Sequence, residues 1–164
     1  MNITTLLNQI RDAIKNSSAI AAWCVANYGQ VHTLAKGMDE RDPLAEASYP
    51  AVCVFQAGRR AGYQLEAQEN TIAVNCGIHD TSKTTSTVEL DEGDDSVIEF
   101  SGIDNIEAFR KLVENEITAL VIGNGDVIEE LNVEYDPIES FPFFIARQEF
   151  RISHDYSQGD DPFE

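Results

Sequence analysis

Basic residues are scarce in this sequence of 164 residues. It contains 11 Lys and Arg against 29 Asp and Glu, which gives a formal net charge of −18 at pH 7. Proteins that bind DNA or RNA through phosphates need clustered Lys and Arg, because each contact neutralises a charge of the nucleic-acid backbone. The charge balance therefore argues against a nucleic-acid reader.

Cysteine is also scarce, with Cys24, Cys53 and Cys76 in an odd number. The last two lie in apolar, strand-like runs, where a thiol packs as a small hydrophobic group. This favours unpaired thiols in a reducing compartment. No run approaches the roughly 18 apolar residues that a membrane span requires, and no basic segment followed by an apolar run stands near Met1. We therefore expect a soluble, cytoplasmic protein.

Motifs of catalysis and of metal binding are missing as well. A nucleophilic site needs Ser or Cys beside a His base, and no local signature accompanies the three cysteines or three histidines. Cys76 and His79 have no second pair to complete a zinc site. The acidic run 91–95 lacks the later Glu of a calcium loop, and the glycines of 123–126 follow a helical pattern instead of preceding one. We expect no enzyme activity, catalytic residue, metal or cofactor.

One alternating stretch, Asn70–His79, organises the predicted fold. It places Ile72, Val74, Cys76 and Ile78 on one side of an extended chain. A strand with one apolar face needs a covering layer and neighbouring strands. The stretches Pro50–Gln56 and Phe143–Ser153 are predicted to be those neighbours.

Two stretches, Ile3–Ile14 and Ile106–Leu120, repeat apolar residues at the three- and four-residue steps of a helix. For the second helix, Asp104 is predicted as the N-cap, and Glu107 completes a variant capping box. Gly123–Gly125 are predicted to end it.

The remaining stretches are less regular. Ala19–Val25 fits either a helix or a strand, and Asn27–Tyr49 is interpreted as a surface connection. The polar and acidic stretch at about 80–100 is predicted to be a long mobile excursion that could contain a short strand pair. Val127–Tyr135 forms an imperfect alternating row.

Together these patterns predict a single α+β domain over residues 1–154. Its mainly antiparallel sheet would carry two main helices packed on one face. Residues 155–164 are predicted to form an acidic flexible tail.

Five charged residues are candidates for contacts with another protein. Arg59 and Arg60 form the densest positive charge of this acidic chain, at the predicted tip of a hairpin. Such a tip is either a solvated turn or a partner contact. Arg147, Glu149 and Arg151 are predicted to form an exposed row on the final strand, which could pair with a neighbouring chain at a sheet edge.

The order of elements and several phrases give the sequence a family resemblance. The phrases are Tyr49–Val54 at the entry to a central strand and Pro142–Ile152 in the final strand, together with the two predicted helices and the strand ending at His79. With these features the sequence resembles the tail terminator (tail completion) proteins of long-tailed bacteriophages and of prophage remnants. The excursion at about 80–100 is longer than the family pattern requires.

The resemblance implies a hexameric ring that sits on the finished tail tube, stops its polymerisation and presents the surface that joins the head. The implied partners are the tail tube protein and the head–tail connector protein. DNA would pass through the ring without specific binding, which suits a lumen that repels phosphate. The protein would act in the bacterial cytoplasm during assembly and then in the neck of the virion.

Two other classes remain open from the residues themselves. One is a small acidic cytoplasmic adaptor or binding protein, such as another neck component, whose surface meets a basic partner. The other is a hydrolase of unrecognised type, which a pocket with converging titratable groups would support.

Overall fold

A computed structural model describes residues 3–37, 44–60, 67–90, 93–121, 127–135 and 141–155. The chain has a mixed α+β fold whose strands are mostly antiparallel, as predicted. The helices are α1 (Ile3–Asn16), α2 (Ser18–Tyr28), the short 3₁₀ helix η1 (Glu46–Ser48) and α3 (Ser101–Thr118). The strands are β1 (Thr33–Lys36), β2 (Ala51–Arg60), β3 (Ala67–His79), β4 (Lys83–Leu90), β5 (Gly93–Phe100), β6 (Val127–Tyr135) and β7 (Phe143–Asp155).

The strand β3 is the centre of a five-stranded sheet with the order β1-β2-β3-β7-β6. It pairs antiparallel with β2 and β7, so that Val74 lies opposite Val54 on one side and Gln148 on the other. The predicted neighbours of the central strand are therefore confirmed.

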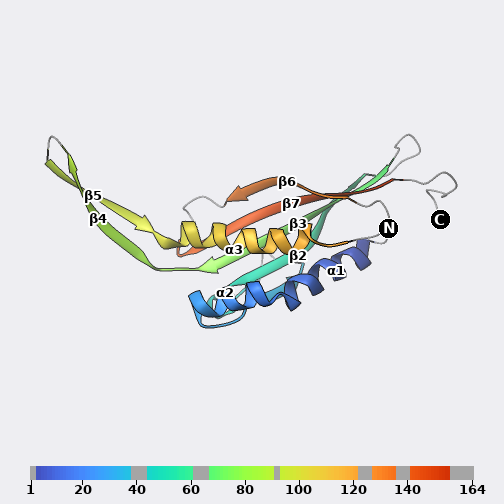
Figure 1. The fold of residues 1–164 in the computed structure, drawn as a ribbon, viewed down its shortest axis with the longest axis horizontal. Helices are drawn as coiled ribbons and strands as arrows, with labels where there is room; N and C mark the ends of the chain where they lie inside the picture. Colours follow the sequence, from blue (N-terminus) through green and yellow to red (C-terminus); the bar gives the residue numbers. More distant parts are fainter. Residues whose placement is uncertain are drawn as a thin grey trace.

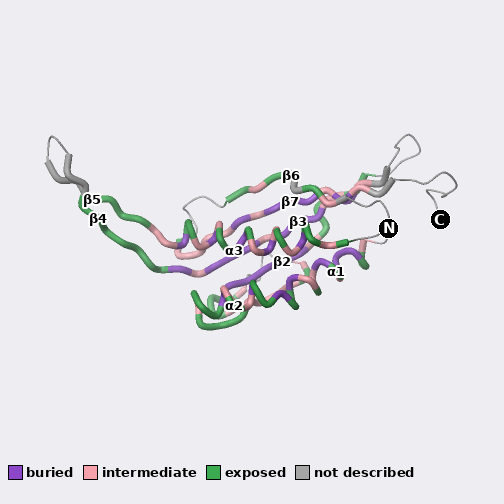
Figure 2. Tube along the Cα trace, in the orientation of Figure 1, coloured by how far each residue is buried: buried purple, intermediate pink, exposed green. Residues whose placement is uncertain are grey.

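One face of the sheet is covered by helices, and the core lies between the two layers (Figure 1). All four apolar residues of the predicted β3 face are fully buried there, as the purple trace in Figure 2 shows. From the helices, Ile10 of α1 and Phe109 of α3 are also fully buried. Both predicted helices are confirmed, and so is their packing on one face.

The ambiguous stretch Ala19–Val25 is helical and belongs to α2. The hydroxyl of Ser17 accepts a hydrogen bond from the backbone N–H of Ile20 at 3.2 Å, which caps the start of the helix. Gly29 ends it in the left-handed conformation, with φ of 71°. The tryptophan of this helix, Trp23, stacks on Phe109 with ring centroids 5.3 Å apart.

The interpretation of Asn27–Tyr49 as a surface connection was wrong for its first part. Residues Thr33–Lys36 form β1, which pairs parallel with β2. Backbone hydrogen bonds from Thr33 to Pro50 (2.8 Å) and from Gly37 to Val54 (2.9 Å) hold its two ends, and Leu34 packs against the core. Four residues show too short an alternation to be recognised as a strand. The charged patch at 39–42 lies outside the described residues.

The predicted N-cap of α3 was also wrong. The helix begins at Ser101, directly after β5, and Asp104 lies inside its first turn. The chain passes from β5 into the helix without a break, and the N–H of Ser101 donates a hydrogen bond to the carbonyl of Ser82 at 3.3 Å. Glu107 pairs with Arg110 instead of completing a capping box. The helix ends at Thr118, and the predicted glycine cap at 123–125 lies outside the described residues.

The excursion at about 80–100 contains the strand pair considered from the sequence, and this pair is longer than expected. Strands β4 and β5 form an antiparallel hairpin whose register begins with Lys83 opposite Phe100. The hairpin projects from one end of the body, and its strands contact mainly each other (Figure 1). Its side chains at 83–87 and 96–99 are exposed (Figure 2).

No helix in the described part of the chain has both the length and the apolar character that crossing a bilayer requires. Of the predicted tail at 155–164, the structure describes Asp155, which ends β7; the remainder lies outside the described residues.

Candidate functional site

Three of the five predicted contact residues lie on β7, on the sheet face opposite the helices. Because β7 lies between β3 and β6, the expectation that this strand pairs with a neighbouring chain at an edge was wrong. Nη2 of Arg147 lies 2.6 Å from Oε1 of Glu149, and Arg151 pairs with Glu129 of β6. These charges are partnered within the chain, which leaves little of this row for another protein.

The other two predicted contact residues, Arg59 and Arg60, lie together at the end of β2 and are exposed. In the sheet register they stand opposite Asn70 and Glu69 of β3. This end of the sheet lies at the far end of the molecule from the β4–β5 hairpin (Figure 1).

A groove of about 560 Å³, which the sequence reasoning missed, lies between the first half of α3, the end of β6 and the start of β7. We call it the aromatic groove. Rings dominate its lining, together with one exposed aliphatic side chain and two carboxylates at its rim. The rings are Phe100, Tyr135, Phe141, Phe143 and Phe144, the aliphatic side chain is Ile103, and the carboxylates are Asp104 and Glu107.

The rings gather because α3 approaches β7 very closely. Gly102 is buried against Phe144, and a Cβ at this position would lie 2.1 Å from a ring carbon. Phe141 packs edge-on against Phe100 and Phe144, with centroid distances of 5.3 and 6.2 Å. The fold therefore presents aromatic rings from β5, β6 and β7 around one groove.

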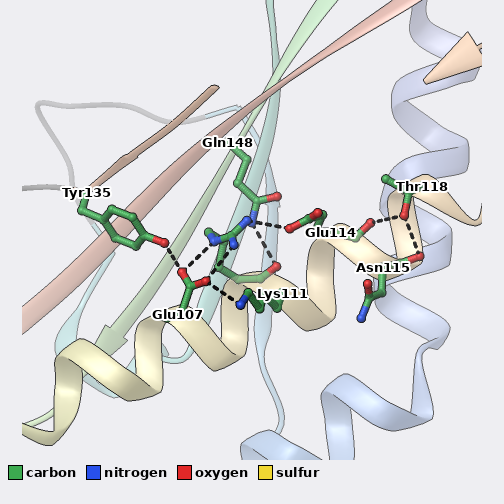
Figure 3. Close-up of polar contacts among 8 residues, drawn as sticks. Glu107, Lys111, Glu114, Asn115, Thr118, Tyr135 and Gln148 are labelled. Atoms are coloured by element: carbon green, nitrogen blue, oxygen red, sulfur yellow. Dashed lines mark hydrogen bonds and ion pairs between the residues drawn. The ribbon is translucent and has the colours of Figure 1, made fainter. Parts of the chain in front are cut away.

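A polar network centred on Arg110 of α3 (Figure 3) reaches the lining of the groove through Glu107 and Tyr135. The guanidinium of Arg110, whose side chain is only 7% exposed, lies 2.9 Å from Glu107 and 2.7 Å from Glu114. Tyr135 donates a hydrogen bond to Glu107, and the amide of Gln148 donates one to the carbonyl of Arg110 at 3.0 Å. The network fixes α3 to β6 and β7.

The hydrogen bonds of this network strongly favour the charged forms of Glu107 and Arg110. The hydrogen bond from Arg110, with further bonds from Tyr135 and Lys111, lowers the pKa of Glu107 to about 2. The same bond raises the pKa of Arg110. Glu107 is therefore a permanent anion at neutral pH, and a general acid or base needs a pKa near the working pH. Glu107 is therefore suited to binding a cation and not to proton transfer.

The thiols offer no nucleophile either. Burial raises the pKa of Cys24 to about 12, and it also raises the pKa values of Cys53 and Cys76, so all three stay protonated at neutral pH. His79 lies 3.3 Å from Glu46, and its ring packs at a tilt against Phe143, away from the buried side of β3. Within the described ranges, no group of three or more His, Cys, Asp or Glu could hold a metal ion.

The polar network beside the groove could be predicted in part from the sequence. The spacing of Glu107, Arg110 and Glu114 places them on one side of a helix, where ion pairs form. The aromatic lining could not be predicted in this way, because its rings come from several segments that only the tertiary fold brings together.

Comparison with family models gives no match for this sequence, and comparison with curated proteins gives none at the threshold of significance. The tail terminator resemblance therefore stays a prediction.

Proposed function

We propose that this protein is a phage tail terminator, which closes into a ring on the end of the tail tube, ends tube polymerisation and joins the tube to the head. The proposal starts from the sequence resemblance and is supported by an α+β body whose helices cover one sheet face. The observation that carries it is the β4–β5 hairpin, which extends from the body toward solvent (Figure 1).

An isolated two-stranded hairpin is marginally stable in water, because it has no layer on which to bury its apolar side chains. In β5, Val97 is 41% exposed and Ile98 is 53% exposed. A projecting ribbon with exposed aliphatic side chains is suited to lie on a neighbouring subunit or on the tube protein, which would cover them.

The net charge of −18 is compatible with a ring through which DNA passes. A lumen lined with carboxylates repels phosphates and avoids the counterion-release affinity that Lys and Arg would add. The same charge opposes assembly at low ionic strength. Ring formation should therefore strengthen with salt, since the screening length falls to roughly 10 Å at 0.1 M.

The test is to measure mass by light scattering at high concentration and raised salt, followed by negative-stain imaging with purified tail tubes. Rings, or density on one end of each tube, are expected. In parallel, the double variant Val97→Ser/Ile98→Ser should lose tube-end binding. Val31→Ser, at an aliphatic side chain 61% exposed outside the hairpin, is the matched control and should bind normally.

The second candidate is an acidic adaptor, and the aromatic groove is the observation that favours it. A groove with aromatic walls and carboxylates at its rim fits a basic segment of another protein. Finding neither rings nor tube-end binding would contradict the terminator proposal and leave the adaptor.

A further inference from the structure

We infer that the aromatic groove binds Arg59 and Arg60 of a second copy of this chain, so that subunits join head to tail. This inference rests on the proposed ring and adds the contact that closes it.

The chemistry of the groove fits a guanidinium group. Arginine stacks on aromatic faces and forms charge-assisted hydrogen bonds with carboxylates. The groove supplies aromatic rings such as Phe141, together with the exposed Asp104 and with Glu107 held as an anion.

The arginine pair is a basic feature that the fold leaves available for another molecule. Most other described arginines have a carboxylate partner in their own chain: Arg11 with Asp12, Arg110 with Glu107 and Glu114, Arg147 with Glu149, and Arg151 with Glu129. Arg59 and Arg60 are exposed and have no ion pair among the residues that the structure describes. In a chain of net charge −18, an exposed pair of arginines of this kind would be attracted specifically to an acidic binding site.

The two surfaces lie at opposite ends of the five-stranded sheet. Phe143 of the groove pairs with His79 at the end of β3, whereas Arg60 pairs with Glu69 near the start of that strand. A chain cannot join these two surfaces to each other, but successive copies can. Such a heterologous contact produces a ring when the rotation between neighbours closes. The contact also sets opposite charges against each other where the rest of the surface repels.

The test is a charge swap at fixed ionic strength. The arginine variant is Arg59→Glu/Arg60→Glu, and the groove variant is Asp104→Lys, at the exposed carboxylate of the lining. Each alone should fail to form rings, or should need at least about tenfold more protein for half-assembly, which corresponds to roughly 1.4 kcal/mol. An equimolar mixture should assemble again, because each altered surface then meets a complementary one in an alternating ring.

Matched controls separate this contact from a general charge effect. Arg11→Glu/Lys15→Glu on α1 changes the net charge as much as the arginine variant does and should assemble like the unaltered protein. Thermal unfolding by circular dichroism checks that each variant folds. If a reversed charge prevents folding, the neutral variants Arg59→Ser/Arg60→Ser and Asp104→Asn replace it, with weaker assembly expected from each.

The outcomes also separate the inference from the proposed function. If the unaltered protein forms rings or binds tube ends while the swapped variants do so equally well, the head-to-tail contact is wrong and the proposed function stands. Recovery of a two-subunit particle in the mixture, instead of a ring, would also overturn the head-to-tail arrangement. If the unaltered protein never assembles, even on tubes, both proposals fail.

Discussion

The body and the β4–β5 hairpin use the same kind of strand pairing with opposite results for burial. In the body, β3 has a paired strand on each side and a helical layer on its apolar face. In the hairpin, β4 and β5 pair along their whole length, yet their side chains at 83–87 and 96–99 remain exposed. Backbone pairing alone buries little apolar surface, so the stability of the chain resides in the body. The hairpin is available for contacts with other molecules.

The largest effect is expected from a charge in the covered face of the body. Val74→Asp places a carboxylate at a fully buried position and should lower the free energy of unfolding by about 3–5 kcal/mol. Urea denaturation measures this loss. The same substitution at the exposed Val31 should change it by less than about 0.5 kcal/mol. Equal effects at the two positions would contradict the placement of the β3 face.

The junction between the two regions should be sensitive to one methyl group. Gly102→Ala would set a Cβ against the Phe144 ring, and overpacking of this kind costs about 1–3 kcal/mol. Gly58→Ala is the control, since its nearest neighbour is an ordinary 3.7 Å away. Thermal melts of both variants compare the sites, and a larger loss at Gly58 would contradict the close packing of α3 on β7.

Glu107→Gln should destabilise the body in a pH-dependent way. At pH 7 the variant loses charge-assisted hydrogen bonds to Arg110, and a loss of roughly 1–2 kcal/mol is expected. The folded-state pKa of Glu107 is lowered from 4.5 to about 2, so its contribution is complete above pH 4.5 and is lost as the pH falls toward 2. Denaturation at several pH values should therefore show the two proteins converging in acid. A constant difference across this range would contradict the ionised pairing.

Polar substitutions in the hairpin should cost much less stability than polar substitutions in the core of the body. Val97→Ser/Ile98→Ser is expected to change the free energy of unfolding by less than about 0.5 kcal/mol, because neither side chain belongs to the core. The same preparation is the one expected to lose tube-end binding. A large loss of stability would mean that the hairpin packs on the body in solution.

The smallest effect is expected from reductant and chelator. Cys24, Cys53 and Cys76 are free and buried. Neither reagent should move the thermal melting curve of the unaltered protein. A downward shift under reductant would reveal a disulfide that the structure lacks.

The body could be predicted from the sequence because its elements carry long regular patterns. The alternation of β3 and the helical periodicity of α1 and α3 each extend over ten residues or more, and each predicted the buried side correctly. The strand β1 was missed because four residues give too little alternation. The start of α3 was misplaced because a strand leads directly into the helix, and Asp104 offered a plausible but unused cap.

The candidate site could be predicted only in part. Arg59 and Arg60 are exposed, as a hairpin tip suggested, whereas Arg147, Glu149 and Arg151 are tied into ion pairs on an inner strand. Which strand becomes an edge depends on the order of the sheet, and local periodicity contains no information about that order. The aromatic groove could not be predicted for the same reason, since only the tertiary fold brings Phe100 beside Tyr135 and Phe141.

The outer strand β6 has a consequence for how the protein behaves at high concentration. Its pairing with β7 shifts register between Glu130 and Asn132, and Glu129 and Glu134 stand along it. An irregular and acidic strand is a poor template for adding another strand, and the opposite outer strand, β1, is only four residues long. Copies of the chain at high concentration should therefore not grow into fibres through pairing of their sheet edges, and any contact between them must use another part of the surface.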